Sequence, residues 1–487
     1  MGTQQSSEDL TEGSLVRPLF KLAWPIVVIQ LLQVTYNVVD TLWLGRLSAD
    51  AVGAVSLAFP VIFLLISFAA GFTTAGAILV AQYTGAEGQS QAGKVTGQTF
   101  VFIGAFSVVI GAVGYLVTEE VLLFLPSEAD TAERVIPLAV DYVEIIFLGL
   151  PLMFGFFVFS AVMRGYGDTR TPMYVMFVTV IINIVLDPFL IFGWGPFPAL
   201  GIEGAALATI AARGTGTIIA IYLIFFTGVG PAARFEHLRP NLATIRDIID
   251  LGVPASLESS MSAFAMITII AVVVSFAPPV VAAYGLGNRI ISIVFLPAMG
   301  LGRATDAMVG QNLGAGKPDR AQRATLLAAG TAAGILLVVA VIAALVPEPI
   351  VAVFLGDVPD AAPTIQFASE YVRIRSAEFV FIGILQVVLG AFRGAGNTRT
   401  ALAFSFITLW LVRVPLVYGL AMPLDWGPTG IWVGMTMGSI VGAIAAGFWF
   451  TRGTWKEAYI DREPTDEPVT PPGGAEVESG EEPVEDD

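Results

Sequence analysis

The sequence of 487 residues contains no cysteine and only one histidine, His237. Cysteine catalysis and disulfide scaffolds are therefore excluded, and a zinc site built from Cys and His ligands is nearly excluded as well. The metalloprotease pattern HExxH and the hydrolase pattern GxSxG are also absent. We therefore expect neither an enzyme nor a protein that carries a bound cofactor.

Charged residues are scarce too, because they make up 13% of the chain against 55% hydrophobic residues. Soluble domains contain roughly a quarter charged residues. An excess of apolar surface on this scale needs lipid around it. The composition therefore predicts an integral membrane protein.

Much of the net charge of -16 comes from the C-terminal end of the chain. Eleven acidic residues between Asp461 and Asp487 face a single base there, Arg462. This segment is rich in Pro, Gly and Glu and has too little apolar surface to fold. We predict a disordered acidic tail over residues 456–487.

Long runs of apolar residues make up most of the sequence. A membrane-spanning helix needs roughly 20 mostly apolar residues. Twelve runs meet that length, over residues 18–42, 51–76, 95–117, 135–160, 171–193, 203–227, 248–275, 280–304, 323–346, 367–391, 400–421 and 429–451. The first lacks a small-residue cleavage site, so we do not expect a removable signal peptide. The predicted fold is all-α, with twelve transmembrane helices.

Basic residues are distributed unevenly between the two sets of alternating loops. One set, with both termini, holds sixteen Lys and Arg residues, whereas the other holds four. Cytoplasmic loops carry the excess of positive charge. We therefore expect a multi-pass protein of the cell membrane with both termini in the cytoplasm.

The chain repeats itself at an offset of 229 residues. This shift places Pro25 on Pro254, VAQYTGA at 80–86 on VGQNLGA at 309–315, and RGYGDTRT at 164–171 on RGAGNTRT at 393–400. Each half holds six predicted helices, and an even number preserves orientation. We expect two lobes related by a pseudo-twofold axis along the membrane normal. The expected division is an N-terminus (1–17), an N-lobe (18–230), an inter-lobe loop (231–247), a C-lobe (248–455) and the tail (456–487).

These duplicated motifs resemble those of the MATE family, the multidrug and toxic compound extrusion transporters, which lie in the same superfamily as lipid-linked oligosaccharide flippases. The resemblance rests on Q-x-x-GA after the second and eighth helices and on RG-x-G-[D/N]-TRT after the fourth and tenth. It covers about residues 15 to 455. These motifs are specific at the level of the family, but they are much less specific about the substrate.

Two predicted helices carry polar side chains that are expensive in lipid and are therefore candidates for function. Asp40 lies on the first helix, and Asn183 and Asp187 lie four residues apart on one face of the fifth. Carboxylate and amide oxygens could bind Na⁺, or the two carboxylates could hold a proton. Alternatively, the acids only hold helices together by hydrogen bonds.

The resemblance adds two residues to this set. Archaeal-type members of the family have a cation site in the N-lobe, and the matching positions here are Asp40, Asn183 and Asp187 with Tyr36 and Thr209. The resemblance thus implies a coupling ion, Na⁺ or H⁺, at these side chains. The offset of 229 places Ile269, Val412 and Leu416 on the first three, so we expect the site in one lobe only.

A substrate cavity is expected between the lobes. Gln33 and Asn37 share a stripe of the first helix with Tyr36 and Asp40, and Met173, Met261 and Glu258 are further candidates for its lining. Alternatively, Glu258 could lie at an interface between helices and not in the cavity. Pro25 removes one hydrogen bond from the first helix, which can therefore kink there. The resemblance suggests that this position is a hinge, and an ordinary static kink is the alternative.

The resulting hypothesis is a secondary transporter in which cation movement drives multidrug export by rocking of the two lobes. We expect a monomer that handles small organic substrates among membrane lipids, with no nucleic acid. A negative cavity would favour cationic compounds. One alternative is a flippase for lipid-linked oligosaccharides, whose relatives commonly have fourteen helices and basic cavities. A channel or receptor would need neither the acidic pair nor duplicated lobe motifs.

Overall fold

The computed structural model describes residues 10–123, 133–355 and 362–461, and every regular element within these ranges is helical. Eleven of the helices are long and apolar enough to cross a membrane, and α13 with α14 forms a twelfth span that is bent by 52°. The predicted all-α protein of twelve spans is therefore confirmed.

Six spans form the N-lobe. Their bounds are α2 Val16–Leu47, α3 Ala49–Gly85, α4 Gln89–Leu123, α6 Ile136–Tyr166, α7 Arg170–Phe192 and α8 Ile202–Phe226. The first three extend beyond the predicted apolar runs at one or both ends, whereas α7 and α8 agree with their runs to within one residue at each end.

The C-lobe repeats this order with two irregular spans. The run predicted at 367–391 bends between α13 and α14, and the run predicted at 400–421 contains a π-helical segment, η2. The bounds are α9 Leu242–Val273, α10 Pro278–Gly314, α11 Pro318–Leu345, α12 Pro347–Leu355, α13 Ala362–Ser376, α14 Phe379–Gly394, α15 Thr398–Phe406, η2 Ile407–Arg413, α16 Val414–Ala421 and α17 Gly427–Thr451. The short turns η1 Phe235–Leu238 and η3 Tyr459–Asp461 lie outside the spans.

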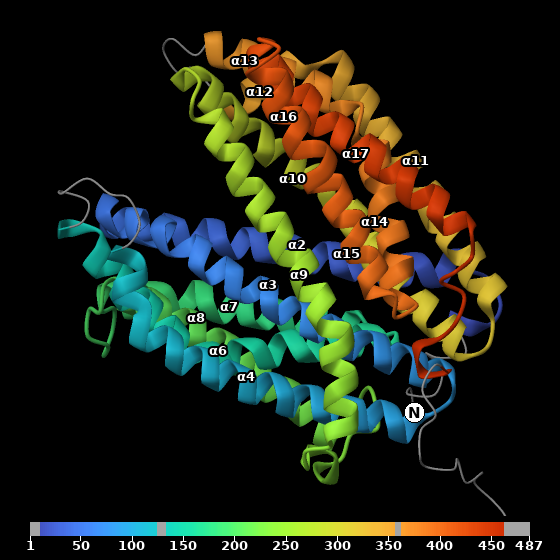
Figure 1. Ribbon diagram of the computed structural model, residues 1–487. Coiled ribbons are helices and arrows are strands. Elements are labelled where there is room, and N and C mark those ends of the chain that lie inside the picture. The colour runs from blue at the N-terminus through green and yellow to red at the C-terminus, as the bar shows by residue number, and fades with distance from the viewer. Residues whose placement is uncertain (1–9, 124–132, 356–361, 462–487) are drawn as a thin grey trace, which may run out of the picture.

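Hydrophobic clusters lie within each lobe and also between the lobes. The largest cluster of buried apolar residues runs from Tyr36 to Leu251 and so includes part of α9, and two others lie within the second half of the chain. A fourth cluster joins Leu19, Leu22 and Ala23 of α2 to residues of α10, α11 and α14. The ribbons of the two lobes meet at one end and diverge toward the other (Figure 1). Between them, α2 packs against α10 and α3 packs against α9, as expected for helices related by a pseudo-twofold axis.

The duplicated motifs join the lobes crosswise at the end where they meet. Gln82 Nε2 on α3 donates to the Gly394 carbonyl at 2.9 Å, and Gln311 Nε2 on α10 donates to the Gly165 carbonyl at 2.8 Å. A Cβ at Gly85 would collide with the backbone of Gln311. Each Q-x-x-GA motif therefore binds the RG motif of the other lobe, and we call these two contacts the cross-lobe pair.

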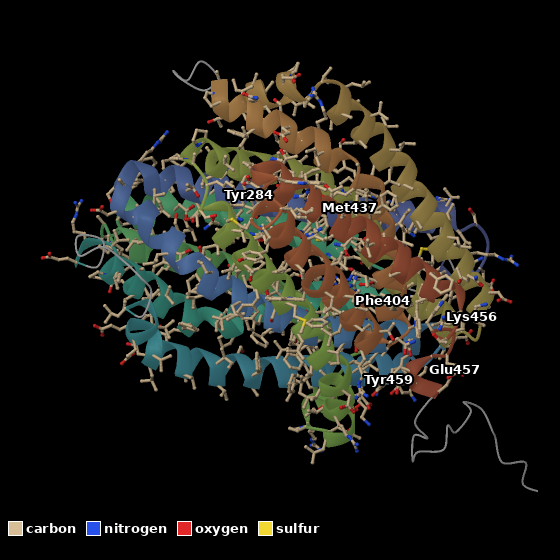
Figure 2. The ribbon with its side chains drawn as sticks, turned by 45° about the horizontal axis from the view of Figure 1, so that its top comes forward. Tyr284, Phe404, Met437, Lys456, Glu457 and Tyr459 are labelled. Carbon is tan, nitrogen blue, oxygen red and sulfur yellow. The ribbon has the colours of Figure 1, made fainter. Side chains whose placement is uncertain are left out.

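Part of the predicted acidic tail is docked at the same end. The backbone N–H groups of Tyr459 and Ile460 donate to Gln82 Oε1 at 2.8 and 3.2 Å. Figure 2 shows Lys456, Glu457 and Tyr459 close to one another, well away from Tyr284. Residues 456–461 are thus ordered against the lobes, and the rest of the tail, residues 462–487, lies outside the described residues.

Candidate functional site

The predicted cation site lies inside the N-lobe, where α2, α7 and α8 meet. Asp40, Asn183 and Asp187 have 6%, 0% and 0% of their surface exposed. Asn183 Nδ2 donates to Asp187 Oδ1 at 3.1 Å, as their spacing of one helical turn allows. Asp40 lies close enough to Asp187 for the two carboxylates to interact electrostatically. The structure therefore brings the three predicted oxygen ligands together.

These side chains have oxygens that no other group satisfies. Asp40 Oδ1, Asn183 Oδ1 and Asp187 Oδ2 have no hydrogen-bond partner among the described residues. Neither carboxylate forms an ion pair with a Lys or Arg there. Burying an unpaired charge costs several kcal/mol, so such groups take up a proton or a metal ion. The two carboxylates are thus buried charges that no basic side chain of the described residues balances.

Two tyrosines and a threonine adjoin the carboxylates. The Tyr36 hydroxyl and Thr209 Oγ1 are 2.6 Å apart, and Tyr142 on α6 is buried close to them. The sequence analysis predicted Tyr36 and Thr209 but missed Tyr142. A signal was available, because the offset of 229 residues pairs Tyr142 with another tyrosine, Tyr371.

The chemistry of these donors favours a hard monovalent cation or a proton. Oxygen donors suit hard cations, whereas transition metals prefer imidazole or thiolate. Among the described residues no three His, Cys, Asp or Glu side chains gather as a metal cluster would require. The two carboxylates and one amide provide oxygen donors, the kind that hard cations prefer.

A cavity of about 300 Å³ lies beside this site. Ile26, Ile29, Gln30 and Gln33 line it as one stripe of α2, and α3, α6, α7, α8 and α10 complete the wall. Three arginines, Arg164, Arg213 and Arg303, line the cavity, and no acidic side chain does. The prediction of a negative cavity is therefore wrong. The expectation of cationic substrates depended on that negative charge and has lost this support.

Of the five side chains predicted for the cavity, only Gln33 lines it. Asn37 is exposed on α2 and accepts a hydrogen bond from Gln33, while Met173 is buried and Met261 is half-buried elsewhere. Glu258 accepts hydrogen bonds from Arg393 at 2.9 Å and from Ser405 at 3.0 Å. A carboxylate neutralised in this way joins helices of the C-lobe, which is the alternative considered for Glu258.

The predicted hinge at Pro25 lies within a continuous α2. Its ring removes the N–H that would bind the Lys21 carbonyl. The Thr169 hydroxyl lies 3.5 Å from that carbonyl and 3.1 Å from the Leu22 carbonyl, to which it donates. Thr169 also lines the cavity, so the helix is supported at Pro25 by a residue of the RG motif. Bending at Pro25 stays a prediction.

Arg213 connects the cavity to the cation site. Its guanidinium donates to Gln33 Oε1 in the cavity and lies over the Tyr36 ring, 5.3 Å from the ring centre. Arg213 follows Thr209 by one turn of α8. Sequence analysis missed Arg213, although a charge within an apolar span is the signal that identified Asp40.

Comparison with known proteins gives consistent matches over most of the chain. The MatE family model matches residues 25–189 and 254–419, so the matches begin at Pro25 and at Pro254, its partner in the repeat. The "Probable multidrug resistance protein YpnP" of Bacillus subtilis is 30% identical over 92% of this chain and 97% of its own length. The "FAD transporter" of Shewanella oneidensis is 27% identical over 84% of this chain and 88% of its own.

Solved structures share the fold. The outward-facing conformation of a multidrug resistance MATE family transporter of the MOP superfamily superposes with a TM-score of 0.85. The match covers 94% of this chain and 99% of that one, at 23% sequence identity. Two lobes of six helices are therefore a shared architecture.

Proposed function

Because this chain belongs to the MatE family of multidrug efflux transporters, we propose that it exports organic compounds in exchange for a cation that moves inward. The observation that carries this proposal is the pair of buried carboxylates, Asp40 and Asp187, with no basic partner among the described residues. Their charge is tolerable in a membrane interior only when a cation is bound. Na⁺ and H⁺ are both candidates.

The distribution of basic residues supports an orientation. The RG motifs lie at the end where the lobes meet, and the set of loops that includes them holds sixteen Lys and Arg residues, against four in the other set. With that end in the cytoplasm, both termini are cytoplasmic and the diverging end opens to the outside of the cell. The described conformation would then be outward-facing.

The proposed cycle alternates between two conformations. A cation from outside binds Asp40, Asn183 and Asp187 and removes the repulsion between the carboxylates. The lobes then rock, the cross-lobe pair separates, and the cavity opens to the cytoplasm. Substrate enters as the cation leaves. Bending of α2 at Pro25 would link the cation site to the cavity, because both lie along this helix.

Inverted vesicles test this proposal. We expect uptake of a dansyl-labelled organic compound when the vesicle lumen holds the higher concentration of the coupling ion, with Na⁺ and H⁺ gradients imposed separately. Asp40→Asn should abolish gradient-driven uptake. Asp250→Asn, which changes a half-exposed acid of α9 that lies 3.9 Å from Arg246, should not. Uptake that needs the opposite gradient, or that survives Asp40→Asn, would contradict antiport.

One observation favours the alternative of a lipid-linked oligosaccharide flippase. The cavity has three arginines, and such flippases commonly have basic cavities. The count of twelve spans argues the other way. Transport of a soluble labelled compound in the vesicle assay would separate the two functions.

A further inference from the structure

The cavity holds one arginine whose positive charge is not balanced. Arg164 forms no ion pair within the described part of the chain, and its Nε has no hydrogen-bond partner there. Its counterpart in the repeat, Arg393, is held by Glu258 at 2.9 Å and by Asp306 at 3.5 Å. Ile29 and Ala77 occupy the positions equivalent to these two acids in the N-lobe. The N-lobe has thus kept the arginine without its carboxylates.

Arg213 is the second unbalanced charge. It is 5% exposed, lines the cavity, and donates to Gln33 Oε1 and, at 3.2 Å, to Met176 Sδ. Aromatic rings of Tyr36 and Phe156 lie within 6 Å of the guanidinium, at 5.3 and 5.8 Å. None of these partners is negatively charged. A buried guanidinium with only neutral partners retains the ability to bind an anion.

Arg303 adds a polar wall without adding net charge. It lies 3.4 Å from Asp306 and donates to Thr74 Oγ1 at 3.3 Å. Arg303, Arg393, Asp306 and Glu258 together form a neutral network. The positive charge of the cavity therefore comes from Arg164 and Arg213.

The rest of the lining is apolar. Ile26, Ile29, Ile66, Phe156, Phe157 and Met299 provide this surface. A volume of about 300 Å³ lies at the lower end of the range for small-molecule sites. A ligand that fits must combine an apolar body with a group that pairs with arginine.

We propose that the cavity binds an amphipathic organic anion, with a carboxylate or phosphate attracted by the positive charges of Arg164 and Arg213 and an apolar body against the isoleucines and phenylalanines. Guanidinium groups bind both kinds of anion in two-point contacts. This inference rests on the proposed function as an exporter and assigns its substrate class. Free organic anions are the proposed source, and a lipid-linked phosphate is the other source of the same chemistry.

Equilibrium binding to the full-length protein in nanodiscs tests the inference without any gradient. Dansylglycine and dansyl ethylenediamine share one body and carry opposite charges. We expect saturable binding of dansylglycine that is at least about tenfold tighter than binding of the amine, because a charge-assisted contact replaces a repulsion. Tighter binding of the amine would overturn the proposal.

Ile29→Glu gives Arg164 the acid that Glu258 provides to Arg393. It should weaken dansylglycine binding about tenfold or more beyond the loss caused by the uncharged variant Ile29→Gln, which measures the loss of the apolar contact alone. Arg213→Gln should weaken binding, and Arg213→Lys should restore part of it. Equal effects of Ile29→Glu and Ile29→Gln, or no effect of Arg213→Gln in a protein with unchanged thermal unfolding, would overturn the assignment.

Two further comparisons separate the sources and the two proposals. If farnesyl phosphate binds to the protein and dansylglycine does not, the proposal that the ligand is a free organic anion is overturned. Asp40→Asn should leave dansylglycine binding intact while it abolishes gradient-driven uptake. Anion binding without any gradient-driven uptake would contradict antiport and leave the anion site standing, whereas driven uptake of the amine alone would contradict only the anion site.

Discussion

The two lobes share one helix order but treat buried charge in opposite ways. In the C-lobe, Glu378 has 0% of its surface exposed, accepts a hydrogen bond from Arg375 Nε, and lies 3.6 Å from Arg413. Arg375 also donates to Tyr371 at 2.8 Å. In the N-lobe, Tyr142 holds the position equivalent to Tyr371, but Asp40 and Asp187 have no basic partner among the described residues.

The two lobes differ in the side chains at two equivalent positions of the repeat. Ile146 and Ile184 occupy the N-lobe positions of Arg375 and Arg413. Two guanidinium groups of the C-lobe neutralise Glu378 there. With isoleucine at those positions, the N-lobe carboxylates have no equivalent basic side chain to neutralise them. Under the proposed antiport, this difference would confine cation exchange to the N-lobe.

The largest expected effect is on stability. Glu378→Gln leaves Arg375 and Arg413 buried without a carboxylate, so it should lower the free energy of unfolding by about 3–5 kcal/mol. Asp187→Asn removes an unpaired carboxylate and should leave stability unchanged or raise it. Thermal unfolding in detergent measures both. The exposed pair of Glu348 and Arg373 provides a control, since Glu348→Gln should cost less than about 1 kcal/mol.

Equal destabilisation by Glu378→Gln and Asp187→Asn would remove the contrast between the lobes. It would mean that Asp187 has a structural partner in the folded protein, and that the N-lobe is as static as the C-lobe.

A smaller effect is expected at the cross-lobe pair. Gln82 binds Gly394 and two backbone N–H groups of the C-terminal segment, whereas Gln311 Nε2 binds Gly165 and its Oε1 has no partner among the described residues. Each hydrogen bond contributes about 1 kcal/mol, which is roughly a fivefold change in a two-state population. Gln82→Leu should therefore separate the lobes at this end more than Gln311→Leu.

The absence of cysteine makes this measurement direct. Spin labels on Gln89→Cys in α4 and Arg323→Cys in α11, both exposed, report the distance between the lobes at the motif end. We expect the fraction of molecules with a long distance between the labels to be larger in Gln82→Leu than in Gln311→Leu. It should be smallest in the protein that retains both glutamines. Identical distance distributions in all three proteins would show that the pair does not hold this end together.

The smallest expected effect concerns the two equivalent prolines. Pro25 lies in α2, which carries Asp40 and lines the cavity, whereas Pro254 lies in α9, whose carboxylate Glu258 is already paired. Pro25→Ala should lower gradient-driven transport by about threefold or more through a stiffer hinge, and Pro254→Ala should lower it less. Vesicle uptake measures both. A larger loss in Pro254→Ala would place the moving helix in the C-lobe.

Local patterns in the sequence determined most of the fold. Apolar runs specify twelve spans because each helix satisfies its own backbone hydrogen bonds in lipid. The offset of 229 residues predicted two lobes from the QxxGA and RG motifs alone. For the cation site, the spacing of Asn183 and Asp187 fixed their common face, and the resemblance identified Asp40, Tyr36 and Thr209 as their neighbours.

Contacts between distant segments decided the rest. Whether Glu258 faces a cavity or a guanidinium depends on Arg393, 135 residues away, and no local pattern records that pairing. The sign of the cavity was also a tertiary property, because Arg164, Arg213 and Arg303 come from three helices of two lobes. The sequence determines which residues are charged. Whether a charge is balanced depends on which helices pack beside it in the tertiary structure.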